Sequence, residues 1–266
     1  MSRRRRVLAA AVVCLLLAAG GAAFVLTRGG DVVPPRERSA AQEKPGPVLL
    51  VPGYGGGTAV LEQLAGRLRA AGRQATVVPM PGDATGDLRA QALVLGAAVL
   101  AAKAAGAASV DVVGFSAGGV VARLWAAHDG GAADARRIVT LGSPHHGTDL
   151  ATFAGALAPD QCPLACRQLA PGSDLITELN RGDETPDGPL WVSIWTTQDQ
   201  VVIPADSARL SGARNVVVQD VCAGRSVGHG QLPADQVVGG LVLRALAAGP
   251  VAAPGPSDCA ALAASG

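Results

Sequence analysis

Ser116 lies in a sequence setting that suits a nucleophile. It is the central residue of a Gly-x-Ser-x-Gly pattern at 114–118, and a largely apolar, β-branched run precedes that pattern. A helical pattern rich in small residues follows directly. A strand, a sharp turn and a helix in this order hold a serine at the tip of the turn, in a strained backbone conformation. The alternative is a glycine-rich turn without chemistry, since the chain contains 35 glycines.

A serine hydroxyl becomes a good nucleophile only when a base accepts its proton, and the base needs an acid to orient it. Asp199 follows a predicted strand and is the candidate acid, with Asp206 and Asp220 as alternatives. His229 lies between the last predicted strand and the closing helix, where it is the candidate base. We therefore expect Ser116 to attack, His229 to carry the proton and Asp199 to orient His229.

Acyl transfer also requires backbone N–H groups that face the developing oxyanion. Ala117 directly follows the serine and offers one such group from the start of the predicted helix. The second is expected in the glycine-rich loop after the first strand, where Tyr54 is the candidate. A merely flexible glycine turn is the alternative for this loop.

Apolar runs and helical periodicity predict six strands that alternate with helices. The strands are expected at 48–51, 74–78, 110–113, 136–141, 190–196 and 215–219, and the main helices at 59–71, 87–105, 117–128 and 233–248. This alternation predicts an α/β fold, a mostly parallel sheet of about six strands with helices on both faces. The long irregular connection 143–189 has the position of a lid-like insertion, and its apolar residues suit an acyl groove or ordinary packing.

The N-terminus has the pattern of an export signal. A basic segment, 2–6, precedes 20 uncharged, mainly apolar residues at 7–26. We expect a signal peptide at 1–28, cleaved near its small residues, although 7–26 is also long enough for an uncleaved membrane anchor. The product would be secreted, or anchored to the outer face of the membrane. Beyond residue 28 the chain holds 17 basic and 21 acidic residues, so nothing indicates a nucleic-acid partner.

The remaining chain divides by composition into three parts. Residues 29–46 are rich in glycine, proline and charge and are expected to form a linker. Residues 47–248 contain all the predicted strands and form the expected catalytic domain. Residues 249–266 are rich in proline and alanine and are expected to be a mostly irregular tail.

Four cysteines follow the predicted signal segment, and an even number in an exported chain indicates disulfides. Three pairings are possible, of which we expect Cys162–Cys166 and Cys222–Cys259. A zinc site is disfavoured, because the Cys-x3-Cys pair has no second pair of ligands at the usual spacing.

Histidines and an acid after the fourth predicted strand raise a second metal alternative, formed by His145, His146 and Asp149. Adjacent histidines point apart in an extended chain. Loop histidines bonded to their neighbours are therefore favoured over a metal site, and we expect neither a metal nor a cofactor.

Five segments together resemble the bacterial lipase and esterase branch of the α/β-hydrolase superfamily: residues 51–56, 113–119 and 140–148 and the loops of Asp199 and His229. The run Leu-Gly-Ser-Pro-His-His-Gly-Thr at 141–148 is the distinctive one, and the resemblance covers about residues 47–248. It implies an α/β-hydrolase fold, the catalytic order Ser, Asp, His, and a secreted triacylglycerol lipase or esterase that forms an acyl-enzyme without a cofactor. Pro52 departs from the family, since many lipases carry histidine there.

Two other functions are alternatives for the same chain. An acyltransferase or amidase would employ the same Ser116, Asp199 and His229, with another acceptor or another bond. A catalytically inactive, envelope-bound binding protein would keep only the fold. Ser116, Asp199 and His229 in the expected order favour the ester hydrolase over the inactive protein.

Overall fold

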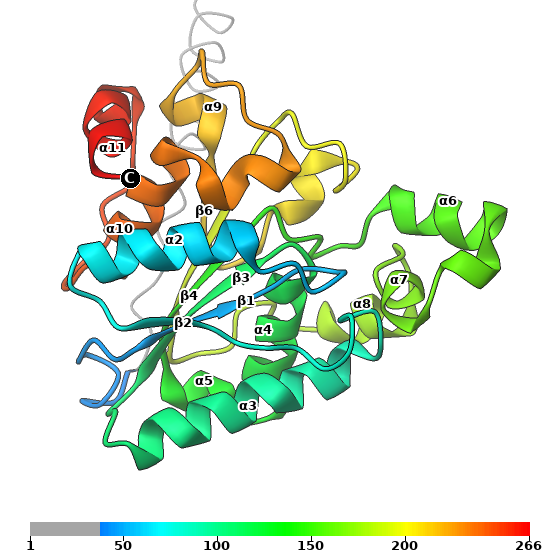
Figure 1. Ribbon diagram of the computed structural model, residues 1–266, viewed down its shortest axis with the longest axis horizontal. Coiled ribbons are helices and arrows are strands. Elements are labelled where there is room, and N and C mark those ends of the chain that lie inside the picture. The colour runs from blue at the N-terminus through cyan, green and yellow to red at the C-terminus, as the bar shows by residue number, and fades with distance from the viewer. Residues whose placement is uncertain (1–37) are drawn as a thin grey trace, which may run out of the picture. The chain divides into compact units, whose positions relative to one another are not determined.

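A six-stranded parallel sheet forms the centre of residues 38–266, the part of the chain that the computed structural model describes (Figure 1). The strand order is β2-β1-β3-β4-β5-β6, with every neighbouring pair parallel, so the prediction of a mostly parallel sheet of about six strands is confirmed. The strands are β1 (Val48–Val51), β2 (Ala75–Val77), β3 (Val110–Phe115), β4 (Ala135–Leu141), β5 (Leu190–Trp195) and β6 (Arg214–Val217).

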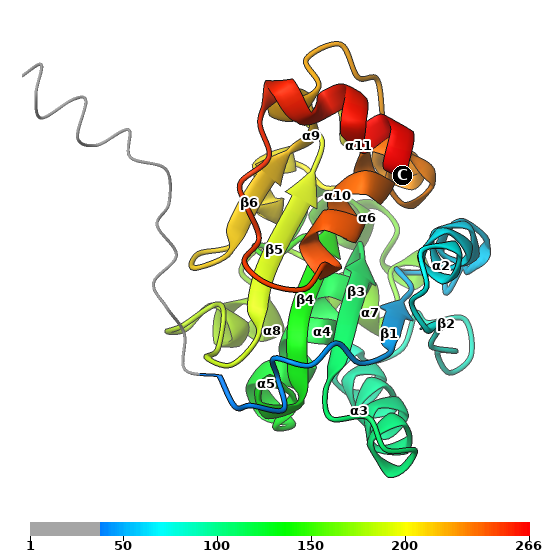
Figure 2. The ribbon, with the colours of Figure 1, turned by 90° about the vertical axis from the view of Figure 1, so that its left-hand side faces the viewer.

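Helices cover both faces of this sheet (Figures 1 and 2). On one face lie α2 (Ala59–Ala70) and α10 (Gln236–Leu246), and on the other lie α3 (Leu88–Ala104) and α4 (Ala117–His128). Successive strand residues point to opposite faces. Leu50 therefore packs in the apolar cluster of α2 and α10, whereas Leu49 packs in the cluster of α3 and α4. Burial on both faces explains why the strands are almost continuously apolar.

The register brings the carboxyl ends of the central strands level. Val51 pairs with Gly114, Phe115 with Leu141, and Leu141 with Ile194. Loops that leave these ends lie at one edge of the sheet, where open α/β sheets bind their ligands. The loops that carry the candidate site residues all leave from this edge.

The sequence predicted an irregular connection at 143–189. The structure shows short helices there instead. These are α6 (Asp149–Leu157), the 3-10 turn η1 (Pro159–Gln161), α7 (Leu164–Gln168) and α8 (Asp174–Leu179). Thr148 caps α6 through Leu150 N–H, and Ser173 caps α8 through Ile176 N–H. Helices of five to nine residues are too short to establish a clear apolar period in the sequence.

The C-terminal segment also differs from the expected irregular tail. It forms the 3-10 turn η4 (Pro256–Asp258) and the helix α11 (Cys259–Ser265), which packs on α10. Gly240 permits this packing, because a Cβ there would lie 2.2 Å from the carbonyl oxygen of Leu262. The short elements α5 (Gly131–Asp134), η2 (Ala205–Ala208), α9 (Val218–Val221) and η3 (His229–Ala234) complete the structure.

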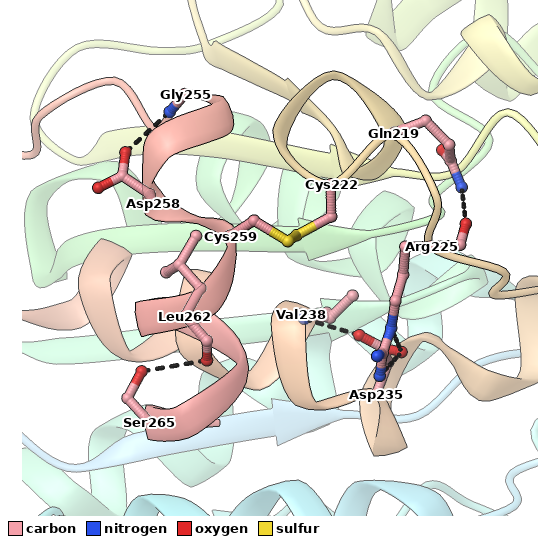
Figure 3. The surroundings of a disulfide bond; sticks show 10 residues. All are labelled: Gln219, Cys222, Arg225, Asp235, Val238, Gly255, Asp258, Cys259, Leu262 and Ser265. Carbon is pink, nitrogen blue, oxygen red and sulfur yellow. Dashed lines mark hydrogen bonds and ion pairs between the residues drawn. A yellow bond between two sulfur atoms is a disulfide. The ribbon is translucent and has the colours of Figure 1, made fainter.

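Both expected disulfides are present, Cys162–Cys166 and Cys222–Cys259. The second joins the end of α9 to the start of α11 (Figure 3). At the other end of the chain, Gln42 of the expected linker is buried and donates hydrogen bonds to the carbonyls of Ala132 and Ala135. The predicted signal segment, 1–28, lies outside the described residues. Among residues 38–266, no helix has the length and apolarity needed to cross a membrane.

A buried charge cluster closes the opposite, amino-terminal edge of the sheet. Asp111 of β3 accepts hydrogen bonds from Arg136 at 2.6 and 3.0 Å and from Arg73 at 2.6 Å. Both arginines also donate to the carbonyl of Leu246 at the end of α10. Arg137 donates to the carbonyl of Ala245 in α10 and to that of Gly249 beyond the helix end, and burial lowers its pKa to about 10. The arginines thus satisfy carbonyls that a helix leaves without partners.

Candidate active site

Ser116 forms the turn between β3 and α4, and its backbone is strained. Its φ of 54° and ψ of −126° lie outside the backbone regions that residues with a Cβ usually adopt. Such a conformation costs about 1–3 kcal/mol of folding free energy. Two close approaches make this turn possible. A Cβ at Gly114 would lie 2.5 Å from Gly119 Cα, and one at Gly118 would lie 2.2 Å from the carbonyl oxygen of Val51. The strand–turn–helix context expected from the sequence is therefore present.

The structure brings Ser116, His229 and Asp199 together although they are far apart in the sequence. Ser116 Oγ lies 3.0 Å from His229 Nε2, and His229 Nδ1 lies 2.7 Å from Asp199 Oδ2. Ser116 and His229 are 9% and 8% exposed, and the Asp199 side chain is 1% exposed. In the tautomer that this geometry favours, Nδ1–H donates to the carboxylate and Nε2 accepts the serine proton.

The acid and the base are each held in place by further contacts. Asp199 Oδ1 accepts the N–H groups of Val201 at 2.9 Å and Val202 at 2.8 Å, which fixes the carboxylate. The ring of Phe115 lies 5.1 Å from the imidazole of His229, centroid to centroid.

The two alternative acids lie on other elements. Asp206 is in η2, and Asp220 is in α9. Within residues 38–266, the carboxylate that bonds to the ring of His229 is that of Asp199.

The two expected oxyanion donors border the serine. Ala117 is the first residue of α4, where backbone N–H groups point out of the helix and carry partial positive charge. Gly53 packs directly on the nucleophile, since a Cβ there would lie 2.9 Å from Ser116 Cβ. Tyr54 directly follows Gly53 in the chain. Within residues 38–266, neither the N–H group of Tyr54 nor that of Ala117 donates a hydrogen bond to another protein group.

The loop after β4 contains both histidines of the metal alternative, and their partners are protein groups. His145 is fully buried, and its Nε2 lies 3.0 Å from Thr140 Oγ1. Burial, together with the charge of Arg123, holds the pKa of His145 well below its ordinary value. His146 Nε2 lies 2.9 Å from Glu184 Oε1, and this hydrogen bond raises the pKa of His146. Among the described residues, no group of three or more His, Cys, Asp or Glu is placed to hold a metal ion.

Arg123 of α4 joins the start of the connection 143–189 to its later part at 179–184, a role that the sequence analysis missed. Its guanidinium donates to the carbonyls of His145, Leu179 and Glu184 and to Asn180 Oδ1. Burial lowers the pKa of Arg123 to about 10, although the negative charges of Glu184 and Asp183 act to raise it. The sequence signal for this role is a single arginine in the middle of the otherwise apolar helical pattern at 117–128.

Comparison with known proteins gives one family model that matches part of the chain, and solved structures with a similar fold. Residues 87–156, from α3 through the serine turn into α6, match the family model described as a PGAP1-like alpha/beta domain. A comparison with curated protein sequences found no match. Lipase B from Aspergillus fumigatus is similar in structure, with a TM-score of 0.68 and 19% identity over 86% of this chain. The mature form of lipase BlEst2 from Bacillus licheniformis has a TM-score of 0.57 and 19% identity over 69% of this chain.

These likenesses identify the fold. The match covers 86% of the Bacillus lipase but 59% of the Aspergillus lipase, so this chain spans less than two thirds of the latter. At 19% identity, similarity to the two lipases defines architecture and not activity. The chain has the α/β-hydrolase fold. Within it, the segment that carries Ser116 is similar to PGAP1-like α/β domains.

Proposed function

We propose that this chain is a serine hydrolase of carboxylic esters that acts through Ser116, His229 and Asp199. The observation that carries the proposal is the pair of hydrogen bonds at 3.0 and 2.7 Å that joins these residues at a strained turn. A serine hydroxyl, a base and an orienting acid in this arrangement are the parts that nucleophilic acyl transfer requires. The similarity to two lipases makes an ester the favoured substrate.

The reaction then has two halves. Ser116 Oγ attacks the ester carbonyl while His229 Nε2 accepts the hydroxyl proton, and the N–H groups of Tyr54 and Ala117 stabilise the oxyanion. The imidazolium gives its proton to the departing alcohol, which leaves an acyl group on Ser116. Water attacks this acyl-enzyme with His229 as its base, and the acid is released. Asp199 remains ionised and stabilises the imidazolium in both halves.

We further propose that the substrate lies in a lipid surface. Exposed apolar side chains lie on α6, on α7 and on the loop after β5 that carries Asp199 (the acid loop): Leu150, Phe153, Leu157, Leu164, Val201 and Ile203. Phe153 and Leu157 are 60% and 84% exposed, and they share one face of α6 at helical spacing. Asp149 N–H donates to the carbonyl of Ile203, which keeps the start of α6 beside the acid loop. A triacylglycerol or similar lipid ester suits this surface, with α6 as the candidate lid.

We also propose that the chain is exported. The basic and apolar start of the sequence supports a signal peptide at 1–28 or an anchor at 7–26. The two disulfides support an oxidising compartment, because such bonds are rare where thiols are kept reduced.

The test is hydrolysis of p-nitrophenyl esters with acyl chains from short to long by the purified full chain and by Ser116→Ala. We expect activity that collapses in Ser116→Ala and rises with chain length. Negligible rates in both proteins would favour an acyltransferase or an inactive binding protein. Equal and substantial rates would show that Ser116 is not the nucleophile.

A further inference from the structure

Val227 lies two residues before His229, and both of its backbone polar groups bond to side chains from the end of β5. Its carbonyl accepts the hydroxyl of Thr196 at 2.8 Å, and its N–H donates to Gln198 Oε1 at 3.1 Å. Gln198 is in turn the residue before Asp199. The chain that leads to the base is therefore tied directly to the chain that leads to the acid.

Thr196 is the centre of this arrangement. Its side chain is fully buried, and its hydroxyl also accepts Gln198 N–H at 3.1 Å and Gln219 Nε2–H at 2.9 Å. One donor and two acceptors are all that a hydroxyl offers, so its capacity is fully used.

Gln219 of α9 holds the same two segments from the other side. Its Oε1 accepts Thr197 N–H at 3.0 Å, and its Nε2 donates to the carbonyl of Arg225 at 3.2 Å (Figure 3). Three residues after Gln219, Cys222 is joined to α11 by the disulfide, and its carbonyl accepts Arg225 N–H. The loop that leads to His229 (the base loop) is thus hydrogen-bonded to α9 and its end, which the disulfide joins covalently to α11.

We propose that the side chains of Thr196, Gln198 and Gln219 form a clamp that sets the distance between Asp199 and His229. This inference rests on the proposed function, because it assigns the three side chains as positioning residues for that reaction. None of them bonds to Ser116 or to the ring of His229; they act on the backbone at 196–198 and 225–227. Errors of about 1 Å in the position of a catalytic group lower rates by up to about 100-fold.

The first test compares Thr196→Val with Thr196→Ser in the full chain. Valine preserves the shape but removes the hydroxyl, whereas serine keeps it. We expect kcat on a soluble short ester to fall about 10- to 100-fold in Thr196→Val, with KM within about twofold of the wild type. Thr196→Ser should recover most of the lost kcat. Wild-type kcat in Thr196→Val, or equal losses in both variants, would overturn the clamp.

A second variant guards against misfolding of Thr196→Val. Gln198 is exposed, so Gln198→Met removes the acceptor for Val227 N–H without disturbing the core. We expect a smaller fall in kcat, an unchanged KM and an unchanged melting temperature. A lower melting temperature with unchanged kcat would instead indicate a purely structural contact.

A spectroscopic readout separates the clamp from the proposed reaction. The proton between His229 Nδ1 and Asp199 Oδ2 should give a far-downfield proton NMR resonance in the wild type and in Thr196→Ser. In Thr196→Val the resonance should shift or broaden beyond detection. If the chain hydrolyses no ester, this measurement still tests the clamp, because it requires no turnover. An unchanged resonance in Thr196→Val would overturn the clamp whatever the activity.

Discussion

Gly142 lies against His229 so closely that a Cβ at Gly142 would be 3.3 Å from Nδ1 of the imidazole and 2.6 Å from Leu232 Cδ1. The same Cβ would lie 3.2 Å from Asp199 Oδ2. Gly142 also has a φ of +52°, which favours glycine. The residue after β4 is therefore glycine for two independent reasons, a backbone conformation and the space that the acid and base occupy.

This contact predicts the effect of Gly142→Ala. The methyl group should displace His229 from Asp199 and lower kcat about 10- to 100-fold. Gly172→Ala is the matched control, because Gly172 has a φ of +74° and nothing within 4 Å of its Cβ position. Both variants should lose about 1–2 kcal/mol of unfolding free energy because alanine is strained at a positive φ. Equal catalytic losses in the two would contradict a specific contact at Gly142.

The parts of this structure that the sequence predicted are those with strong local patterns. Predominantly apolar runs of four to seven residues located β1, β3, β4 and β5, because strands buried on both faces are mainly apolar. Ser116, Asp199 and His229 were accessible to prediction because each follows a strand end. Their distances could not be foreseen, since a sequence order does not define the packing between loops.

The parts that escaped prediction depend on contacts between distant residues. The helix α11 has no apolar period, and Gly240 and the disulfide from Cys222 hold it in place. Thr196 and Gln219 are ordinary polar residues near strand ends in the sequence, where such types are common. Their importance arises only when the acid and base loops meet.

Removing the charge of Asp111 should cause a large loss of stability. Its carboxylate is fully buried and is bonded to both Arg73 and Arg136, so Asp111→Asn leaves the buried Arg136 and the partly buried Arg73 uncompensated. We expect a loss of about 3–5 kcal/mol in the free energy of unfolding, measured in urea. Glu62→Gln is the control, because Glu62 and its partner Arg69 are half exposed and contribute at most about 1 kcal/mol. A small loss in Asp111→Asn would show that its charge is not needed.

The two disulfides should differ in their contributions. Cys222–Cys259 spans 37 residues and Cys162–Cys166 spans four. A longer closed loop restricts the unfolded chain more, which gives about 4 kcal/mol for the first bond and about 2 kcal/mol for the second. Urea unfolding of the two paired cysteine-to-alanine variants measures both values. A greater loss from removing the short-range bond would contradict this entropic account.

The hydrogen bond between His146 and Glu184 should make a contribution to stability that depends on pH. The pKa of His146 is raised in the folded protein, mainly by the hydrogen bond to Glu184, above an unfolded value of about 6.5. The stabilisation is therefore fully present below about pH 6.5 and is lost as the pH rises through the folded pKa. Because the His146 side chain is 43% exposed, the amount should not exceed about 1 kcal/mol.

The measurement for His146 is the unfolding free energy of His146→Gln at about pH 5.5 and about pH 8.5. The variant should be less stable than the wild type at the lower pH and closer to it at the higher pH. Glu184→Gln should reproduce this pattern, because it removes the carboxylate charge that favours the protonated imidazole. His128→Gln, on the exposed end of α4, is the control. A difference that grows with pH would refute the assigned sign.

The exposed face of α6 predicts a defect that appears only at a lipid surface. Burying a phenylalanine or leucine side chain is worth about 1.5–3 kcal/mol, so Phe153→Ser with Leu157→Ser should weaken binding to phosphatidylcholine vesicles at least about 10-fold. Cosedimentation in a Ser116→Ala background measures this binding without hydrolysis. Leu93→Ser with Leu100→Ser is the matched control, because these leucines are 62% and 67% exposed but lie on α3 (Figure 1). On a soluble short ester, with Ser116 intact, both pairs of substitutions should leave kcat/KM unchanged. Equal loss of vesicle binding in both pairs would mean that general hydrophobicity, and not the exposed face of α6, binds the lipid.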